Sequence, residues 1–521
     1  MRRSPARLSL LLLVLLSLAP APLAQSLDER LREIDEYAAR AGRDWNVPGF
    51  AVAVVKDDKV VFAKGYGVRE LGKPEAVDKD TLFAIASNTK AFTSAALATL
   101  VDEGKLKWDD PVTKYLPYFQ LYDAYATREM TVRDLVSHRS GLATFGGDLL
   151  WFETTYPREE IIRRVRHLRP AYSFRSRYGY QNIMFLAAGE IVPAVTGKSW
   201  DDYVREKFFA PLRMTRTTTS HKQLLQTPNI ATPHNELRGK LRVIHYDDVD
   251  NAGGAAAISS SVADMAQWLR LQLGRGAYEG RAIFSPRQSR EMWTPHTVVG
   301  GVSEAAERFN PTAHFNLYGL GWFLGDYHGR KVVSHGGGLD GMISRVALMP
   351  EESLGLVVLT NSETPLSSVI SNKIFDTFLG VPKRDWSADY LKRRDAGRAA
   401  EEAEEKKVEA ARAANTKPSL PLEAYAGTYT GVMFGDAKVA VENGRLVVRL
   451  APSPNFVGDL EHWHYDTFSI RWRDSIVYPF GRGFVTFNLD ARGQVDEMKI
   501  DVPNPDFDFK ELEFKRAPAE R

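Results

Sequence analysis

Residues 82–101 read LFAIASNTKAFTSAALATLV, an extended apolar run that leads into a helix of small, apolar residues. Ser87 and Lys90 stand three positions apart at the start of this helix, so both lie on one helix face within contact distance. The first turn of a helix also offers free backbone N–H groups and the positive end of the helix dipole. A lysine in such an apolar helix is costly to bury without partners. The stretch therefore predicts a buried central helix that carries a serine–lysine pair.

This pair has the chemistry of an activated nucleophile. A serine hydroxyl is a weak nucleophile until a neighbouring base accepts its proton, and an adjacent lysine can be that base. Ser87 is the only serine of the chain with lysine three positions later. About one or two such strings are expected by chance in a chain of this length and average composition, so the pair alone is a weak signal.

Two further stretches strengthen it. Tyr180-Gln181-Asn182 precedes an apolar helix, and a tyrosine and an asparagine two apart point the same way from an extended segment. His335-Gly336-Gly337-Gly338 ends a predicted strand, where glycines let a substrate backbone approach and offer N–H groups to an oxyanion. Each stretch alone is weak evidence for a catalytic site, because tyrosine usually packs in a core and His-Gly-Gly usually forms a turn.

Taken in order, the three stretches resemble the motifs of the serine β-lactamase and penicillin-binding-protein superfamily, in particular its class C and peptidase/esterase branch. Those motifs are Ser-x-x-Lys, Tyr-x-Asn, and a strand motif of Lys-Thr-Gly or His-x-Gly. The similarity covers about residues 28 to 380 and includes the loop Leu135 to Leu142, LVSHRSGL. It implies an α+β fold with a β-lactamase/transpeptidase-like antiparallel sheet and a helical subdomain.

The resemblance also implies roles for the motif residues. Ser87 would be the nucleophile that forms an acyl-enzyme, and Lys90 and Tyr180 would share the proton as the base system. A free tyrosine titrates near 10, so Lys90 would have to lower the pKa of Tyr180 for the phenolate to act. Asn182 would hold Lys90 and the substrate amide.

The strand motif would border the substrate. His335 and Gly337 would line the sheet edge where substrate lies, and the N–H groups of Ser87 and Gly338 would form the oxyanion hole. Many members of the superfamily have lysine where this chain has His335. Histidine is largely neutral near pH 7. The departure weakens the case for efficient β-lactam hydrolysis and favours an esterase, an aminopeptidase-like or D-amino-acid peptidase, or an amide hydrolase.

The rest of the chain predicts three segments after the N-terminus. Strand-like runs near both ends of residues 25–385, with helices between them, indicate one antiparallel sheet built from the two ends. Residues 386–417 are rich in charge and alanine, which predicts a helical linker. Residues 418–521 alternate in hairpins, one around Asn443-Gly444, and predict a small lipocalin-like all-β barrel.

Residues 1–24 read as a signal peptide. Basic residues precede an apolar run from Leu8 to Leu18, and small residues follow it. The run is too short for a membrane span, which needs about 20 apolar residues. We therefore expect an exported protein, periplasmic or extracellular, with no transmembrane anchor in the mature chain.

The composition of the chain limits the kinds of partner and metal site to expect. The 521 residues carry a net charge of +2, which gives no reason to expect nucleic acid, and no cysteine, which excludes disulfides and thiolate metal sites. His462 and His464 share one strand face, but no third ligand accompanies them. We therefore expect neither a metal nor a cofactor. The oligomeric state is not predicted.

The leading hypothesis is a serine hydrolase that acts through an acyl-enzyme on ester or amide substrates, including D-aminoacyl peptides. One alternative is a weak β-lactamase or a penicillin-binding DD-peptidase. Another is a non-catalytic binding protein on the same fold, whose barrel binds a lipid, peptide or cell-wall fragment. The expected partner is a small molecule or a peptide.

Overall fold

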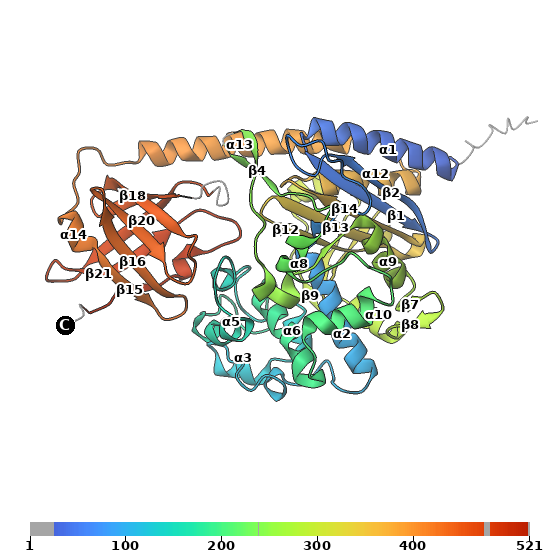
Figure 1. Cartoon of the computed structure of the whole chain (residues 1–521), viewed down its shortest axis with the longest axis horizontal. Helices are drawn as coiled ribbons and strands as arrows, with labels where there is room; N and C mark the ends of the chain where they lie inside the picture. Colours follow the sequence, from blue (N-terminus) through green and yellow to red (C-terminus); the bar gives the residue numbers. More distant parts are fainter. Residues whose placement is uncertain (1–24, 238, 474–479, 519–521) are drawn as a thin grey trace, which may run out of the picture.

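The computed structural model describes residues 25–237, 239–473 and 480–518. These residues form a large α+β body and a smaller barrel, which the long helix α13 (Trp386–Ala410) joins (Figure 1). No helix among the described residues combines the length and the apolar character needed to cross a membrane. The predicted signal peptide at 1–24 lies outside the described residues.

The large body is built on an eight-stranded antiparallel sheet. In spatial order its strands are β2 (Lys59–Gly67), β1 (Gly49–Lys56), β14 (Leu354–Thr360), β13 (Met342–Met349), β12 (Arg330–Leu339), β11 (Phe323–Tyr327), β10 (Asn316–Tyr318) and β9 (Thr297–Val298). Strand β1 pairs with β14 along its length, with Phe50 opposite Thr360. Because these strands come from opposite ends of the body's sequence, the pairing confirms the predicted sheet.

Both faces of this sheet are covered, which explains why β1 is apolar at almost every position. Val52 and Val54 face the helices α1 (Leu27–Asp44) and α12 (Leu366–Leu379), which lie along one face with the start of α13 (Figure 1). Ala51 and Ala53 face the opposite way, into the core shared with the helical region.

The helical region centres on α2 (Thr89–Asp102), in which every residue from Thr89 to Leu100 is buried. Helices α6 (Asn182–Thr196) and α9 (Val262–Leu273) are also largely buried. The remaining helices are α3 (Ala124–Glu129), α4 (Val132–Leu135), α5 (Arg158–Arg164), α7 (Trp200–Val204), α8 (His221–Gln226), α10 (Pro286–Met292) and α11 (Glu304–Phe309). Three short strand pairs complete it: β3 (Phe83–Ala84) with β6 (Ser259–Ser260), β4 (His234–Leu237) with β5 (Lys240–Val243), and β7 (Ala277–Tyr278) with β8 (Arg281–Ala282).

The C-terminal part is a closed antiparallel barrel, as predicted. After the short helix α14 (Leu422–Tyr425) its strands are β15 (Gly427–Gly431), β16 (Gly435–Glu442), β17 (Arg445–Leu450), β18 (Val457–His464), β19 (Thr467–Trp472), β20 (Gly483–Leu489), β21 (Val495–Asp501) and β22 (Phe514–Arg516). Asn443 and Gly444 join β16 to β17 with φ values of 50° and 73°, the left-handed conformation that a tight hairpin turn requires.

The barrel contacts the helical region of the large body. The rings of Phe152 and Phe507 lie 4.3 Å apart between centroids. The Tyr156 hydroxyl donates a 2.7 Å hydrogen bond to the carbonyl of Phe434 in the barrel. A carboxylate oxygen of Glu511, beyond β21, accepts a 2.7 Å bond from the N–H of Gly147. These contacts bring barrel residues to the segment between α4 and α5.

Candidate active site

Ser87 lies in a single 3₁₀ turn, η1 (Ala86–Asn88), between β3 and α2. The preceding residue, Ala86, has a φ of 46°, in the left-handed region that non-glycine residues rarely adopt. Strained backbone of this kind is concentrated at functional sites, where the surrounding structure maintains it. The turn presents the Ser87 side chain at the start of α2, as the sequence predicts.

The strand motif lies directly against this turn. A Cβ atom at Gly337 would come within 2.2 Å of the carbonyl oxygen of Ile85 and 2.9 Å of the backbone nitrogen of Ser87. Only glycine permits so close an approach of β12 to η1. The third motif therefore meets the first at backbone level.

Lys90 is completely buried beneath Ser87. Its Nζ atom lies 3.0 Å from Ser87 Oγ, 2.6 Å from Asn182 Oδ1 and 3.1 Å from the carbonyl oxygen of Ala255. Burial lowers the pKa of Lys90 to about 7, and the negative charge of Asp148 acts in the opposite direction. At neutral pH a large share of Lys90 is therefore an uncharged amine able to accept a proton.

Asn182 connects Lys90 to a buried carboxyl group. Its Nδ2 atom donates a 2.5 Å hydrogen bond to Asp148 Oδ2, while its Oδ1 atom accepts from Lys90. Burial raises the pKa of Asp148 to about 7. The charge of Glu511 in the barrel raises the pKa of Asp148 further, and burial raises the pKa of Glu511 itself to about 7. A line of polar groups thus runs from the barrel to the lysine.

Tyr180 lies on the other side of the lysine. Lys90 Nζ is 4.7 Å from the centre of its ring, and the ring of His138 packs against it with a centroid distance of 4.2 Å. Burial raises the pKa of Tyr180 well above its ordinary value, and a hydrogen bond with Ser87 acts in the opposite direction. The phenol is therefore protonated at neutral pH. The expectation of a lowered pKa for Tyr180 is not met, because burial outweighs the opposing hydrogen bond with Ser87.

His335 is buried behind the strand edge and is only 2% exposed. Its Nε2 atom lies 3.0 Å from the Tyr318 hydroxyl, and its Nδ1 atom lies 2.5 Å from the carbonyl oxygen of Gly336. A carbonyl only accepts, so Nδ1 carries the proton and Nε2 accepts from the tyrosine. Burial, followed by the charge of Lys90, lowers the pKa of His335 to about 3, so the ring is neutral.

The edge of β12 beside Ser87 is open. Strand β11 pairs with β12 only from Arg330 to Ser334. The turn between β12 and β13 closes on the pair Leu339 and Met342, so hydrogen-bonded pairs alternate with non-bonded pairs from there. Gly338 belongs to a non-bonded pair, and its N–H points away from β13 toward the open edge. An extended substrate can add to this edge.

We call Ser87, Lys90, Asp148, Tyr180 and Asn182 the catalytic cluster. Sequence reasoning identifies four of them and misses Asp148, which follows a Gly-Gly pair in a loop and carries no motif. It also misses the carbonyl of Ala255 and the barrel carboxylate of Glu511. The two histidines noted on one strand face contact other groups: His462 Nε2 contacts the carbonyl of Tyr465, and His464 Nδ1 accepts from the N–H of Ala413.

A sequence profile of the β-lactamase family matches residues 32–379, about two thirds of the chain. The chain belongs to the β-lactamase family. A second profile, of a domain of unknown function termed DUF3471, matches residues 411–516 and covers the barrel.

Hydrolases stand among the similar proteins. The unguisins hydrolase ungD' of Aspergillus campestris (strain IBT 28561) is 31% identical over 412 residues, which span 74% of this chain and 73% of that protein. The protein flp of Staphylococcus aureus (strain NCTC 8325 / PS 47) is 27% identical over 343 residues, 63% of each chain. This β-lactamase family member is accordingly a hydrolase.

Two solved structures share the fold. The octameric penicillin-binding protein homologue from Pyrococcus abyssi superposes with a TM-score of 0.60 at 20% identity, over 93% of this chain and 99% of that one. The D-stereospecific amidohydrolase from Streptomyces sp. superposes with a TM-score of 0.52 at 22% identity, over 67% and 99%. The first of these extends over the barrel as well as the large body.

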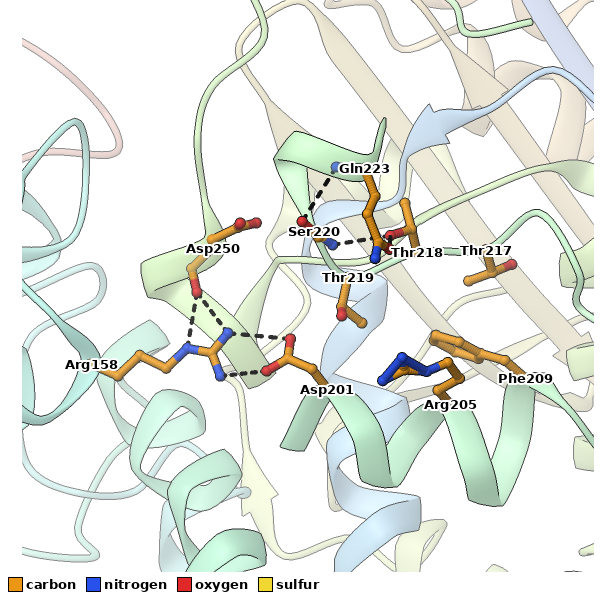
Figure 2. A pocket seen from close by; sticks show the side chains of 10 residues that line it. All are labelled: Arg158, Asp201, Arg205, Phe209, Thr217, Thr218, Thr219, Ser220, Gln223 and Asp250. Atoms are coloured by element: carbon orange, nitrogen blue, oxygen red, sulfur yellow. Dashed lines mark hydrogen bonds and ion pairs between the residues drawn. The ribbon is translucent and has the colours of Figure 1, made fainter. Parts of the chain in front are cut away.

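A separate cavity of about 250 Å³ lies in the helical region and is lined by none of the catalytic cluster (Figure 2). Its most buried charge, Arg158, donates to the carboxylate of Asp201 and to the carbonyl of Asp250. The carboxylate of Asp250 accepts from the N–H of His221. Arg158, Asp201 and Asp250 therefore largely satisfy one another.

Proposed function

We propose that the chain is a serine hydrolase that cleaves ester or amide substrates through an acyl-enzyme on Ser87. The observation that carries this proposal is the 3.0 Å distance between Ser87 Oγ and Lys90 Nζ, in a site whose burial lowers the pKa of Lys90 to about 7. A base with a pKa near the working pH is the most effective general base. Asn182 and the carbonyl of Ala255 hold this amine in place.

In the first step the Lys90 amine takes the Ser87 proton while Oγ forms a bond to the substrate carbonyl carbon. The electron pair of the carbonyl moves to its oxygen, which the N–H groups of Ser87 and Gly338 stabilise. Removing one such donor typically costs about 2.7–4 kcal/mol of activation free energy.

In the second step the intermediate collapses and the bond to the leaving group breaks. Tyr180, protonated and close to both Ser87 and Lys90, passes a proton from the lysine ammonium to the leaving oxygen or nitrogen. Water then attacks the acyl group, Lys90 accepts the water proton, and Ser87 leaves with a proton from Lys90. The cycle regenerates every group.

The surroundings favour an amide or peptide substrate. The open edge of β12 accepts an extended backbone, and neutral His335 supplies no fixed cation for a substrate carboxylate. The name D-stereospecific amidohydrolase supports an amide next to a D-configured residue, and the name unguisins hydrolase supports hydrolysis. We further propose that residues 1–24 direct export, so that the substrate is met in the periplasm or outside the cell.

The test combines labelling with turnover. Mass spectrometry of the full chain treated with a fluorophosphonate should locate one adduct on Ser87, and Ser87→Ala should show none. A panel of nitrophenyl esters, D- and L-aminoacyl amides and a chromogenic cephalosporin then defines the substrate. Preferential turnover of the D-aminoacyl amides supports the proposal.

Other outcomes favour the alternatives. Fastest turnover of the cephalosporin would indicate a β-lactamase or a penicillin-binding peptidase. Absence of both labelling and turnover would indicate a binding protein on the same fold. Labelling that persists in Ser87→Ala would overturn the assigned nucleophile.

A further inference from the structure

A second group of ionisable side chains gathers outside the catalytic cluster. Glu153, His245 and Asp247 each place one potential ligand atom within 4.8 Å of the other two. Glu153 lies in the loop before α5, and the other two lie in the loop after β5. The closest measured approach, from His245 Nε2 to Glu153 Oε1, is 3.7 Å.

Asp247 has an unsatisfied oxygen. Its side chain is buried, with only 6% of the residue exposed, and Oδ2 accepts a 3.3 Å hydrogen bond from the N–H of Asp340. Oδ1 is buried as well and has no hydrogen-bond partner. Burying an unpartnered carboxylate oxygen is costly, so this oxygen is available to a ligand that reaches it.

Carboxylates are the principal charges that act on Asp247 among the described residues. The carboxylates of Glu153 and Glu363 act on the charge of Asp247. Asp247 and Glu363 act in turn on the charge of Asp340. The charges that act most strongly on both groups are carboxylates, so the region attracts a cation.

We propose that Glu153, His245 and Asp247 bind one divalent cation of the zinc or manganese type. One imidazole nitrogen with two carboxylate oxygens is a ligand set that these ions accept, whereas Ca²⁺ and Mg²⁺ prefer oxygen alone. Ligand atoms at about 2.1 Å from a tetrahedral zinc lie about 3.4 Å apart, so a modest contraction of the group completes the site. Its remaining positions are open to water, because the His245 side chain is 44% exposed.

The position of the site suggests what the ion does. Glu153 Oε2 also accepts a 2.7 Å hydrogen bond from Asn455 in the barrel. Asp247 holds Asp340, which starts the β12–β13 turn two residues after Gly338. A bound cation therefore braces the barrel and the end of β12 together at the rim of the catalytic site. It takes no part in the bond-breaking steps.

This inference departs from the sequence, which predicts no metal. The three ligands have no motif spacing, because Glu153 stands about ninety positions before the His-x-Asp pair. Only the fold brings them together. The inference does not depend on the proposed hydrolase activity, and its test does not use activity.

Isothermal titration of the metal-free full chain tests the site with Zn²⁺ alone and Mn²⁺ alone, and with Ca²⁺ and Mg²⁺ for comparison. We expect one equivalent of Zn²⁺ or Mn²⁺ to bind, with affinity at least tenfold lower in His245→Ala and in Asp247→Asn. Asp248→Asn is the matched control, since it removes the same charge from the neighbouring exposed residue and should bind as the natural chain does.

A spectroscopic measurement separates this site from other histidines. Bound Mn²⁺ should show electron-spin-echo modulation from one imidazole nitrogen, and His245→Ala should abolish it. If Asp247→Asn does not fold, His245→Ala decides alone, because that side chain lies at the surface. Failure of the natural chain to bind either ion, or equal binding by His245→Ala and Asp248→Asn, would overturn the proposal.

Discussion

The catalytic cluster and the acidic group around Asp247 each contain a buried carboxyl group, but the two carboxyl groups have different charged neighbours. Asp148 shares a hydrogen-bonded amide with Lys90, so the chain supplies its own counter-charge and the pKa values of both groups lie near 7. Asp247 instead faces further carboxylates. Asp148 has a counter-charge within the chain and tunes a base, whereas the proposed cation would bring the counter-charge of Asp247 from outside.

Removing Lys90 should have the largest effect on activity. Lys90→Met should reduce kcat/KM by about 10³-fold or more, since a general base typically contributes about 10² to 10⁴. The melting temperature should hold or rise, because a buried amine is replaced by an apolar side chain of similar length and Asp148 can remain protonated. Ester turnover and thermal unfolding measure the two effects.

Lys373 supplies the control for that experiment. It is also buried, but it pairs with Glu33 at 2.5 Å on the far face of the sheet. Lys373→Met should remove the buried partner of Glu33, which keeps Lys383 and Gln25, and lower the melting temperature with catalysis unchanged. If both lysine variants lose stability equally, Lys90 acts as a member of an ordinary structural ion pair.

Asp247→Asn should change the melting temperature in opposite directions without and with metal. A carboxyl with a raised folded-state pKa favours folding below its unfolded pKa of about 4, and this contribution is lost as pH rises through the folded value. In EDTA at pH 8 the variant should therefore melt at least about 2 °C higher than the natural chain. Scanning calorimetry should show this advantage vanish near pH 4 and reverse when Mn²⁺ is added.

The sign of the change in melting temperature distinguishes two causes. A variant that only removed a hydrogen bond to Asp340 would melt lower at every pH. Asp248→Asn should show neither the gain in EDTA nor the loss of metal stabilisation. A lower melting temperature at pH 8 without metal would therefore remove the case for uncompensated charge around Asp247.

Asp148→Asn tests how the Asp148 charge affects Lys90 within the catalytic cluster. The Asp148 carboxylate raises the pKa of Lys90 against the effect of burial. Its removal should lower the lysine pKa, so the acidic limb of the kcat/KM profile should move down by about one pH unit. A pH–rate profile between pH 5 and 9 measures the limb. No movement would show that Asp148 acts by geometry alone, and an upward movement would contradict the electrostatic account.

Glu511→Gln should have the smallest effect and the opposite sign. The Glu511 charge raises the pKa of Asp148, so its removal leaves Asp148 more ionised and lifts the pKa of Lys90 slightly. Glutamine can still accept from the N–H of Gly147 and keep the barrel in place. The acidic limb should move up by a few tenths of a pH unit. No movement would mean that the barrel is electrostatically silent.

Local pattern accounts for what the sequence predicts well. Ser87 and Lys90 meet because they share one helix turn, and the barrel follows from alternating strands joined by turns such as Asn443-Gly444. The sheet built from both chain ends is confirmed for the same reason, since β1 and β14 are short apolar runs at opposite ends of one body. The family resemblance adds Tyr180 and Asn182 to the lysine.

Charge compensation over long separations accounts for what the sequence misses. Asp148 reaches Asn182 across 34 positions, and Glu511 reaches Gly147 across 364, with no motif at either place. The pKa of Tyr180 depends on burial that only the packed fold creates. Glu153 and Asp247 likewise become neighbours through tertiary structure alone.

The most direct test of the central claim is the rate at which a fluorophosphonate labels Ser87 as a function of pH, in the natural chain and in Tyr180→Phe. If Lys90 is the base, both proteins should show labelling that rises through a single ionisation near pH 7, with Tyr180→Phe slower throughout. If the phenolate of Tyr180 is the base, Tyr180→Phe should lose the ionisation and the labelling together, and the account given for Lys90 would be contradicted.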